Sequence, residues 1–134
     1  MIENLNSCTI GLGSNTPDRQ YQIEQVIEYL LGILQRPSAS AVYESEAFNG
    51  KDKPYLNAVV HGYTSHDKDS MIKMLKKWEA DHGRTMEDTL SGVIKIDLDL
   101  VIWNEHILRP KDFERHYFNR GYRELLAKGA FELL

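Results

Sequence analysis

Apolar residues alternate with other residues in four stretches of the chain and recur at helical spacing in two more. The alternating stretches predict β-strands over residues 7–13, 38–48, 55–63 and 94–103. One helical stripe consists of Ile23, Val26, Ile27, Leu30, Leu31 and Leu34. Thr16 and Pro17 predict the start of this helix as N-cap and first helical residue, and Pro37 lies beyond its end.

The second helical stripe predicts a helix from about Asp67 to His82, terminated by Gly83. Its expected buried residues are Met71, Ile72, Leu75 and Trp78. After the fourth strand, a turn leads to a short hairpin arm at residues 107–108, and a tail helix is expected over residues 123–134.

The order of these elements is β-α-β-β-α-β, followed by the hairpin and the tail helix. This order predicts an α+β fold of the ferredoxin-like type, with a mainly antiparallel sheet and two helices on one face. The opposite face is then expected to be open. In the strand over residues 38–48, one face is expected to carry Ala39, Ala41, Tyr43 and Ala47, and the other face Glu44 and Glu46.

Length and composition are those of one ordinary globular domain covering residues 1–134, with 42% hydrophobic and 27% charged residues. The net charge of −4 argues against a general nucleic-acid-binding protein. The single cysteine, Cys8, is expected to be a buried thiol. No leader and no apolar run of about 20 residues is recognised, so a cytoplasmic location without membrane contact is expected.

Two aspartates of the fourth strand are the main candidates for chemistry. Asp97 and Asp99 lie two residues apart and therefore on one face of the strand, with Cβ atoms about 6.5–7 Å apart. Such a pair suits Mg²⁺, which prefers one or two carboxylates together with substrate phosphates. A solvated strand face that carries two acidic residues is the alternative. Tyr55 and Asn57 of the third strand are expected on the same open face, which would make it a ligand platform.

Several segments, in this order and at this spacing, resemble the 6-hydroxymethyl-7,8-dihydropterin pyrophosphokinase family. They are Gly11-Leu12-Gly13-Ser14-Asn15, Tyr43-Glu44-Ser45, Phe48-Asn49-Gly50, Pro54-Tyr55-Leu56-Asn57, Glu79 with Gly83-Arg84, Asp97-Leu98-Asp99-Leu100, His116-Tyr117 and Asn119-Arg120-Gly121-Tyr122. The resemblance implies magnesium-dependent transfer of pyrophosphate from ATP to the hydroxymethyl group of a pterin.

The resemblance also implies roles for individual residues. Asp97 and Asp99 would bind the metal and, with Arg84, form the catalytic group. The residues implied at the pterin are Ser45, Gly50, Tyr55, Asn57 and Tyr122, the last in place of a stacking Phe. Those implied at the nucleotide are Glu79, Arg84, Lys111, His116 and Arg120.

Taken without the family, the same residues have ordinary structural explanations. Asn57 would pair with a neighbouring loop, and Tyr122 would be a core residue. Arg84 follows a helix C-terminus, where a cation is favourable without any ligand. His116 would be a surface histidine.

The segment 85–94 departs from the family pattern because it contains no arginine. Ile94 and Ser91 stand where the family has an Arg and a Trp, and Glu87 and Asp88 add negative charge. Arginines that contact a transferred phosphoryl group contribute strongly to rate, so this departure bears on catalysis more than on folding.

Three hypotheses remain open. The chain is a working pyrophosphokinase that uses Arg84, Lys95 or Lys111 in place of the lost arginines, a relative that binds a pterin or nucleotide without efficient transfer, or a partner-binding domain. The expected partners are small molecules, and the expected state is a monomer or weak dimer.

Overall fold

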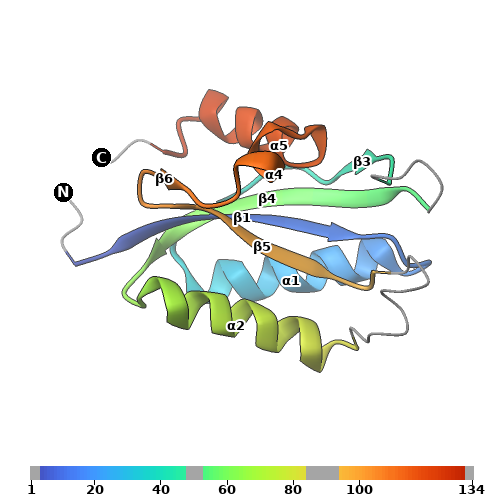
Figure 1. Ribbon diagram of the computed structural model, residues 1–134, viewed down its shortest axis with the longest axis horizontal. Coiled ribbons are helices and arrows are strands. Elements are labelled where there is room, and N and C mark those ends of the chain that lie inside the picture. The colour runs from blue at the N-terminus through green and yellow to red at the C-terminus, as the bar shows by residue number, and fades with distance from the viewer. Residues whose placement is uncertain (1–3, 48–52, 84–93, 132–134) are drawn as a thin grey trace.

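A single antiparallel sheet forms the centre of the protein (Figure 1). The computed structural model describes residues 4–47, 53–83 and 94–131. The elements are β1 (Asn6–Ser14), α1 (Arg19–Ile33), β2 (Gln35–Ala39), β3 (Tyr43–Ser45), β4 (Tyr55–Thr64), α2 (Lys68–Asp81), β5 (Asp97–Trp103), β6 (His106–Ile107), α4 (Pro110–Glu114) and α5 (His116–Ala127). The strand order is β2-β4-β1-β5-β6, and β3 also pairs with β4. The predicted α+β class and the β-α-β-β-α-β order are confirmed.

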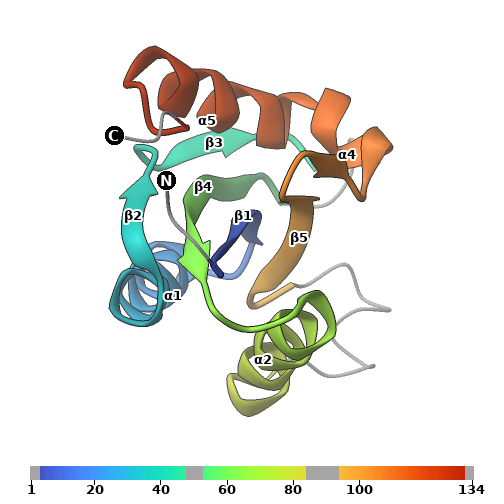
Figure 2. The same ribbon diagram turned by 90° about the vertical axis from the view of Figure 1, so that its left-hand side faces the viewer.

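Helices α1 and α2 cover one face of the sheet (Figure 2). The core between them and the strands includes Ile10, Leu30, Ala58, Leu75 and Leu98, all of which are almost fully buried. Cys8 belongs to the same core, and burial raises the pKa of its thiol to about 12. The predicted buried thiol is therefore confirmed.

The opposite face of the sheet is not fully open, and on this point the prediction was wrong. Helix α5 lies across one part of it, where Val59, Val101, Phe118 and Leu125 form a second buried cluster. The predicted tail helix over 123–134 instead begins at His116 and ends at Ala127. Phe118 and Leu125 lie seven residues apart and give α5 the apolar stripe that docks on the sheet.

The predicted strand over 38–48 is divided into β2 and β3, which both pair with β4. The division occurs at Ser40, whose hydroxyl accepts the Val59 N–H at 2.9 Å while its own N–H donates to the Val59 carbonyl at 2.8 Å. The next N–H, of Ala41, donates to the Glu124 carboxylate of α5 at 2.9 Å. Because of this break, Ala39 packs against the α1–α2 core whereas Tyr43 points toward α5, so the expected common face is wrong.

Helix α1 begins two residues later than predicted. The hydroxyl of Thr16 donates to the Asp18 carboxylate at 2.6 Å, and the helix has no side-chain cap. Helix α2 agrees with the prediction: the Asp67 carboxylate accepts the Ser70 N–H at 2.8 Å, and Gly83, with φ of +87°, follows the helix. No helix of the described residues has the length and apolar character needed to span a membrane.

Strand β5 begins at Asp97 and contains one irregularity. Thr9 pairs with Ile102 and Ile10 with Leu100, so Val101 is an extra residue in β5. Beyond this bulge, Ile102 faces the α5 side and Trp103 joins the α1–α2 core, contrary to the predicted alternation. Asp97 and Asp99 precede the bulge and keep the predicted face.

Two glycines provide a matched test of how α5 is docked. A Cβ atom on Gly121 would lie 2.6 Å from Val59 Cγ2 and 3.0 Å from the Tyr43 hydroxyl, whereas one on Gly32 would meet nothing within 4 Å. We expect Gly121→Ala to destabilise the protein by about 2–3 kcal/mol through overpacking. Gly32→Ala, in exposed α1, is expected to stabilise it by about 0.5–1 kcal/mol. Urea unfolding of both variants measures these changes, and an unchanged midpoint for Gly121→Ala would contradict the described docking.

Candidate active site

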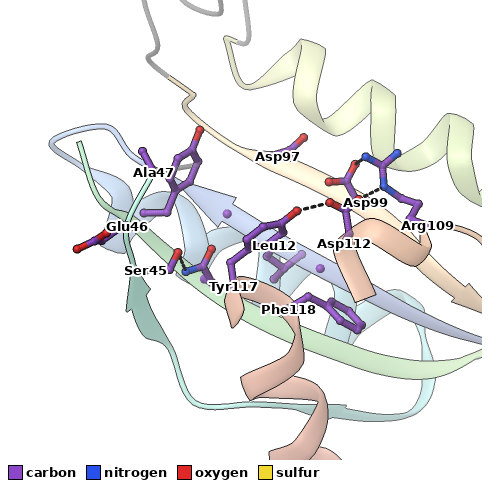
Figure 3. A pocket seen from close by; sticks show the side chains of 14 residues that line it. Leu12, Ser45, Glu46, Ala47, Asp97, Asp99, Arg109, Asp112, Tyr117 and Phe118 are labelled. Atoms are coloured by element: carbon purple, nitrogen blue, oxygen red, sulfur yellow. Dashed lines mark hydrogen bonds and ion pairs between the residues drawn. The ribbon is translucent and has the colours of Figure 1, made fainter. Parts of the chain in front are cut away.

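A cavity of about 340 Å³ opens on the sheet face that α5 leaves uncovered (Figure 3). Its floor is formed by β1 and β5, and its walls come from β3, β4, α4 and the first turn of α5. The residues that line it are Gly11, Leu12, Gly13, Ser45, Glu46, Ala47, Tyr55, Asn57, Asp97, Asp99, Arg109, Asp112, Tyr117 and Phe118. Five of the predicted site residues are among them.

Gly11 and Gly13 of β1 contribute no side chain of their own to the floor, and neighbouring aromatic rings lie over them: a Cβ on Gly11 would be 3.1 Å from Phe118 Cδ1, and one on Gly13 would be 3.4 Å from Tyr55 Cδ2. Gly13 pairs with Asn57 on one side and with Asp97 on the other, and Gly11 pairs with Asp99. Asn57, Gly13 and Asp97 thus form a row across three strands, and a spacing of about 4.8 Å between strands places its ends about 10 Å apart. The row therefore begins at an amide and ends at the pair of carboxylates.

The carboxylate pair is held in an environment that disfavours two negative charges. Burial, the charge of Asp97 and a hydrogen bond with it raise the pKa of Asp99 to about 7. Two cations oppose this rise: Arg109 lies 3.8 Å and Lys76 4.0 Å from Asp99 Oδ1. A divalent cation bound by both carboxylates would remove their mutual repulsion.

The donor set fits Mg²⁺ better than a metal that needs a full cage of protein ligands. The described residues contain no cluster of three or more His, Cys, Asp or Glu side chains suited to a metal ion. Mg²⁺ is typically held by one or two carboxylates, with substrate phosphates and waters completing its coordination. Asp97 and Asp99 are the residues that would hold it.

Asn57 is fixed from behind by hydrogen bonds within the protein. It is 2% exposed, and its amide nitrogen donates to the Ser45 hydroxyl at 2.7 Å and to the Tyr43 carbonyl at 3.3 Å. Ser45 therefore orients the amide, and its carbonyl oxygen, which can accept hydrogen bonds, accepts none from the residues that the structure describes.

Aromatic side chains form two walls of the cavity, Tyr55 from β4 and Tyr117 from α5. The Tyr117 hydroxyl donates to the Asp112 carboxylate, which also accepts a hydrogen bond from Arg109 Nε (Figure 3). The Tyr117 main-chain carbonyl accepts the Tyr43 hydroxyl at 2.7 Å. Both ends of Tyr117 are thus held in place.

Tyr122, predicted to stack on the pterin, does not line the cavity. Because α5 begins at His116, Tyr122 lies in the middle of this helix. Its ring packs in the second cluster, 5.0 Å from Phe113 and 5.2 Å from Phe131 between ring centroids. The pterin contact of Tyr122 stays a prediction, and it is Tyr117 that lines the wall of the cavity.

A second cavity, of about 230 Å³, lies beside the first, between α2 and the edge of β5. Apolar residues form most of its lining: Ile72, Leu75, Leu98, Leu100 and Leu108. Lys76, Asp99 and Arg109 complete it, and the last two line both cavities. Asp99 and Arg109 thus mark the junction of a polar cavity with a mainly apolar one.

The residues predicted at the nucleotide are less closely grouped. Glu79 is buried and its carboxylate accepts the Leu98 N–H at 2.7 Å, so it supports β5 from α2. Lys111, His116 and Arg120 are exposed and line neither cavity. Arg120 lies over the Tyr43 ring, 5.3 Å from its centroid. Gly50 and Arg84 are outside the described residues.

Arg109, Asp112, Tyr117 and Lys76 were missed as site residues by sequence reasoning. Tyr117 belongs to one of the resembling segments. The direction of its side chain depends on where α5 begins, and the hydrophobic pattern of the sequence does not specify that residue. Lys95, considered as a substitute cation, lines neither cavity. Its side chain lies beside Gly83, and a Cβ atom on Gly83 would be 3.0 Å from the Lys95 Nζ.

Two known proteins are similar to this chain over most of its length. Over 103 residues, 76% of this chain, it is 34% identical to the 2-amino-4-hydroxy-6-hydroxymethyldihydropteridine pyrophosphokinase of Aquifex aeolicus. Over 102 residues, 72% of this chain, it is 28% identical to the folate synthesis bifunctional protein of Arabidopsis thaliana. These matches span 64% and 20% of the two relatives.

A solved structure, the C-terminal domain of the MgtC protein from Mycobacterium tuberculosis, matches with a TM-score of 0.41 and 11% identity. The match covers 75% of this chain and 92% of that domain, and at this level it carries no argument. The model of the 7,8-dihydro-6-hydroxymethylpterin-pyrophosphokinase (HPPK) family, in contrast, matches residues 9–127, which include every residue of both cavities. The chain therefore belongs to the HPPK family.

Proposed function

We propose that the protein transfers pyrophosphate from ATP to the hydroxymethyl group of 6-hydroxymethyl-7,8-dihydropterin. The observation that carries this proposal is the position of Asp99, which lines both cavities and pairs with Asp97. A reaction between two bound molecules needs their reacting atoms to meet, and the junction of the cavities provides such a point.

The polar cavity suits the pterin. Its aromatic walls accept a planar ring, while Asn57 at the end away from the carboxylates offers a hydrogen bond to the ring edge. With the ring oriented in this way, its hydroxymethyl group would reach toward the carboxylate pair.

The second cavity suits the nucleotide. Its leucine and isoleucine lining accepts a base, and its polar end at Asp99 and Arg109 accepts the phosphates. Bound Mg²⁺ would neutralise phosphate charge and align the polyphosphate. The pterin hydroxyl oxygen would attack the β-phosphorus, the bond between this phosphorus and the α,β-bridging oxygen would break, AMP would leave, and the hydroxyl proton would pass to solvent.

Production of AMP by the purified protein tests the proposal. With ATP, Mg²⁺ and the reduced pterin we expect equal amounts of AMP and pterin pyrophosphate, and no AMP when the pterin is omitted. The absence of AMP together with the absence of binding of either ligand in calorimetry would contradict the proposed function.

A second candidate is a relative that binds both ligands with little transfer. It is favoured by the segment 85–94, which has no arginine and carries Glu87 and Asp88. Binding of both ligands without AMP would support this second candidate. We further propose a cytoplasmic monomer or weak dimer that does not bind nucleic acid, in keeping with the net charge of −4.

A further inference from the structure

Lys76 occupies a position at the site that the catalytic scheme above does not use. It lies on α2 at the opening of the second cavity, and its side chain is 53% exposed. Its Nζ is 3.3 Å from Glu79 Oε1 and 4.0 Å from Asp99 Oδ1. Of these two carboxylates, Glu79 also accepts the Leu98 N–H, so it keeps a hydrogen bond when Lys76 moves.

The arrangement around Asp99 works against metal binding without a nucleotide. Lys76 and Arg109 already place two positive charges within 4.0 Å of Asp99. A divalent cation at the same carboxylate would lie close to the positive charges of Lys76 and Arg109. Like charges at this distance repel unless an anion lies between them. Mg²⁺ alone is therefore expected to bind weakly.

A polyphosphate supplies the missing anion. Mg²⁺ is usually held by one or two carboxylates together with substrate phosphates, so a polyphosphate bound with the ion would lie beside Asp99, where Lys76 Nζ is 4.0 Å from Oδ1. The flexible stem of a partly exposed lysine permits the small movement needed to contact a phosphate oxygen.

We propose that Lys76 is a polyphosphate-binding residue, which moves its contact from Asp99 to the phosphates when nucleotide and Mg²⁺ bind and thereby couples the two binding events. This proposal rests on the proposed function, because it assumes that the second cavity holds the nucleotide. In this proposal Lys76 of α2 supplies part of the positive charge that the segment 85–94, which contains no Lys or Arg, does not provide.

Lys76→Met tests this role, and Lys77→Met is the matched control. Lys77 is the next residue of α2, is 77% exposed and pairs with Asp81 at 2.9 Å, away from both cavities. Calorimetric titration with Mg²⁺ and α,β-methylene-ATP is expected to give about tenfold weaker binding for Lys76→Met and unchanged binding for Lys77→Met. Lys76→Arg is expected to restore most of the affinity.

The metal-only measurement is expected to change in the opposite direction. Titration of Mn²⁺ without nucleotide, followed by electron paramagnetic resonance, should show severalfold tighter binding for Lys76→Met than for wild type, since one repelling charge is gone. A purely structural role would weaken both measurements together. Thermal unfolding of each variant verifies that the protein used is folded.

The outcomes separate the two proposals. Equal affinity of wild type and Lys76→Met for the nucleotide analogue would overturn the role of Lys76 and leave the proposed function standing. Tighter Mn²⁺ binding without a loss of nucleotide affinity would also overturn it. Wild-type protein that binds no nucleotide would overturn the proposed function, and the role of Lys76 with it.

Discussion

Magnesium-dependent nucleotide binding is expected to be lost when Asp97→Asn and Asp99→Asn are combined. Asn keeps the shape of Asp but removes the charge that a hard cation requires, so turnover should fall by about 10³-fold or more. The fold should persist, because both carboxylates face a cavity. Calorimetry with Mg²⁺ and α,β-methylene-ATP, together with AMP release, measures the effect. Asp81→Asn, on the outer side of α2, is the control, and retained metal-dependent binding in the double variant would refute the metal assignment.

A separate prediction concerns Asp99 in the absence of metal, namely the pH dependence of the free energy of unfolding. Asp99 has a pKa of about 7 in the folded protein, above the value of about 4 in an unfolded chain. The folded protein therefore holds a proton that the unfolded chain releases between these values, so the contribution of Asp99 is complete below about pH 4 and is lost as the pH rises through 7.

The comparison is made with Asp99→Asn, in the absence of metal. We expect the unfolding free energy of wild type, relative to this variant, to fall as the pH rises from about 4 to about 7. A difference independent of pH over this interval would contradict the raised pKa.

Pterin affinity is expected to fall by about 30–100-fold in Tyr117→Leu. The substitution removes one aromatic wall of the cavity, and loss of stacking and of buried area against a planar ligand costs about 2–3 kcal/mol. Fluorescence or calorimetric titration with the reduced pterin measures this loss. Nucleotide affinity should change much less, because Tyr117 does not line the second cavity.

Tyr122→Leu is the control for this prediction, since the sequence alone favoured Tyr122 as the stacking residue. It is expected to lower the melting temperature, through the loss of contacts with Phe113 and Phe131, while leaving pterin affinity nearly unchanged in the folded protein. If Tyr122→Leu lost affinity and Tyr117→Leu did not, the assignment from the structure would be wrong.

The two tyrosines also show what could be predicted from the sequence. The faces of Asp97, Asp99, Tyr55 and Asn57 follow from alternation along a strand, which is a local property, and the structure places all four at one cavity. The direction of Tyr117 depends instead on where α5 begins, and helix ends are poorly specified by pattern. Because the start of α5 was not predicted, the packing of this helix over part of the sheet was not predicted either.

The cations of the site could not be predicted for a different reason. Arg109 follows the β5–β6 hairpin and Lys76 lies on an exposed turn of α2, so each is unremarkable in the sequence. The packing of α2 against β5 brings Lys76 to 4.0 Å from Asp99, and the return of the chain along β5 after the hairpin brings Arg109 to 3.8 Å. The bulge at Val101 likewise depends on the pairing of β5 with β1, and the alternation of apolar residues within β5 does not predict it.

Helix α5 supplies Tyr117 and Phe118 to the cavity, although it is joined to the sheet through contacts distant in sequence, such as the hydrogen bond of Tyr43 to the Tyr117 carbonyl. During synthesis the residues of β1 to β5 leave the ribosome first, so a growing chain can form much of its sheet before it possesses a complete pterin site. A pterin bound between sheet and helix would then stabilise the newly docked α5 by RT ln(1 + [L]/Kd), where [L] is the free pterin concentration. The supply of substrate would thus influence how long a freshly made chain remains open to proteases.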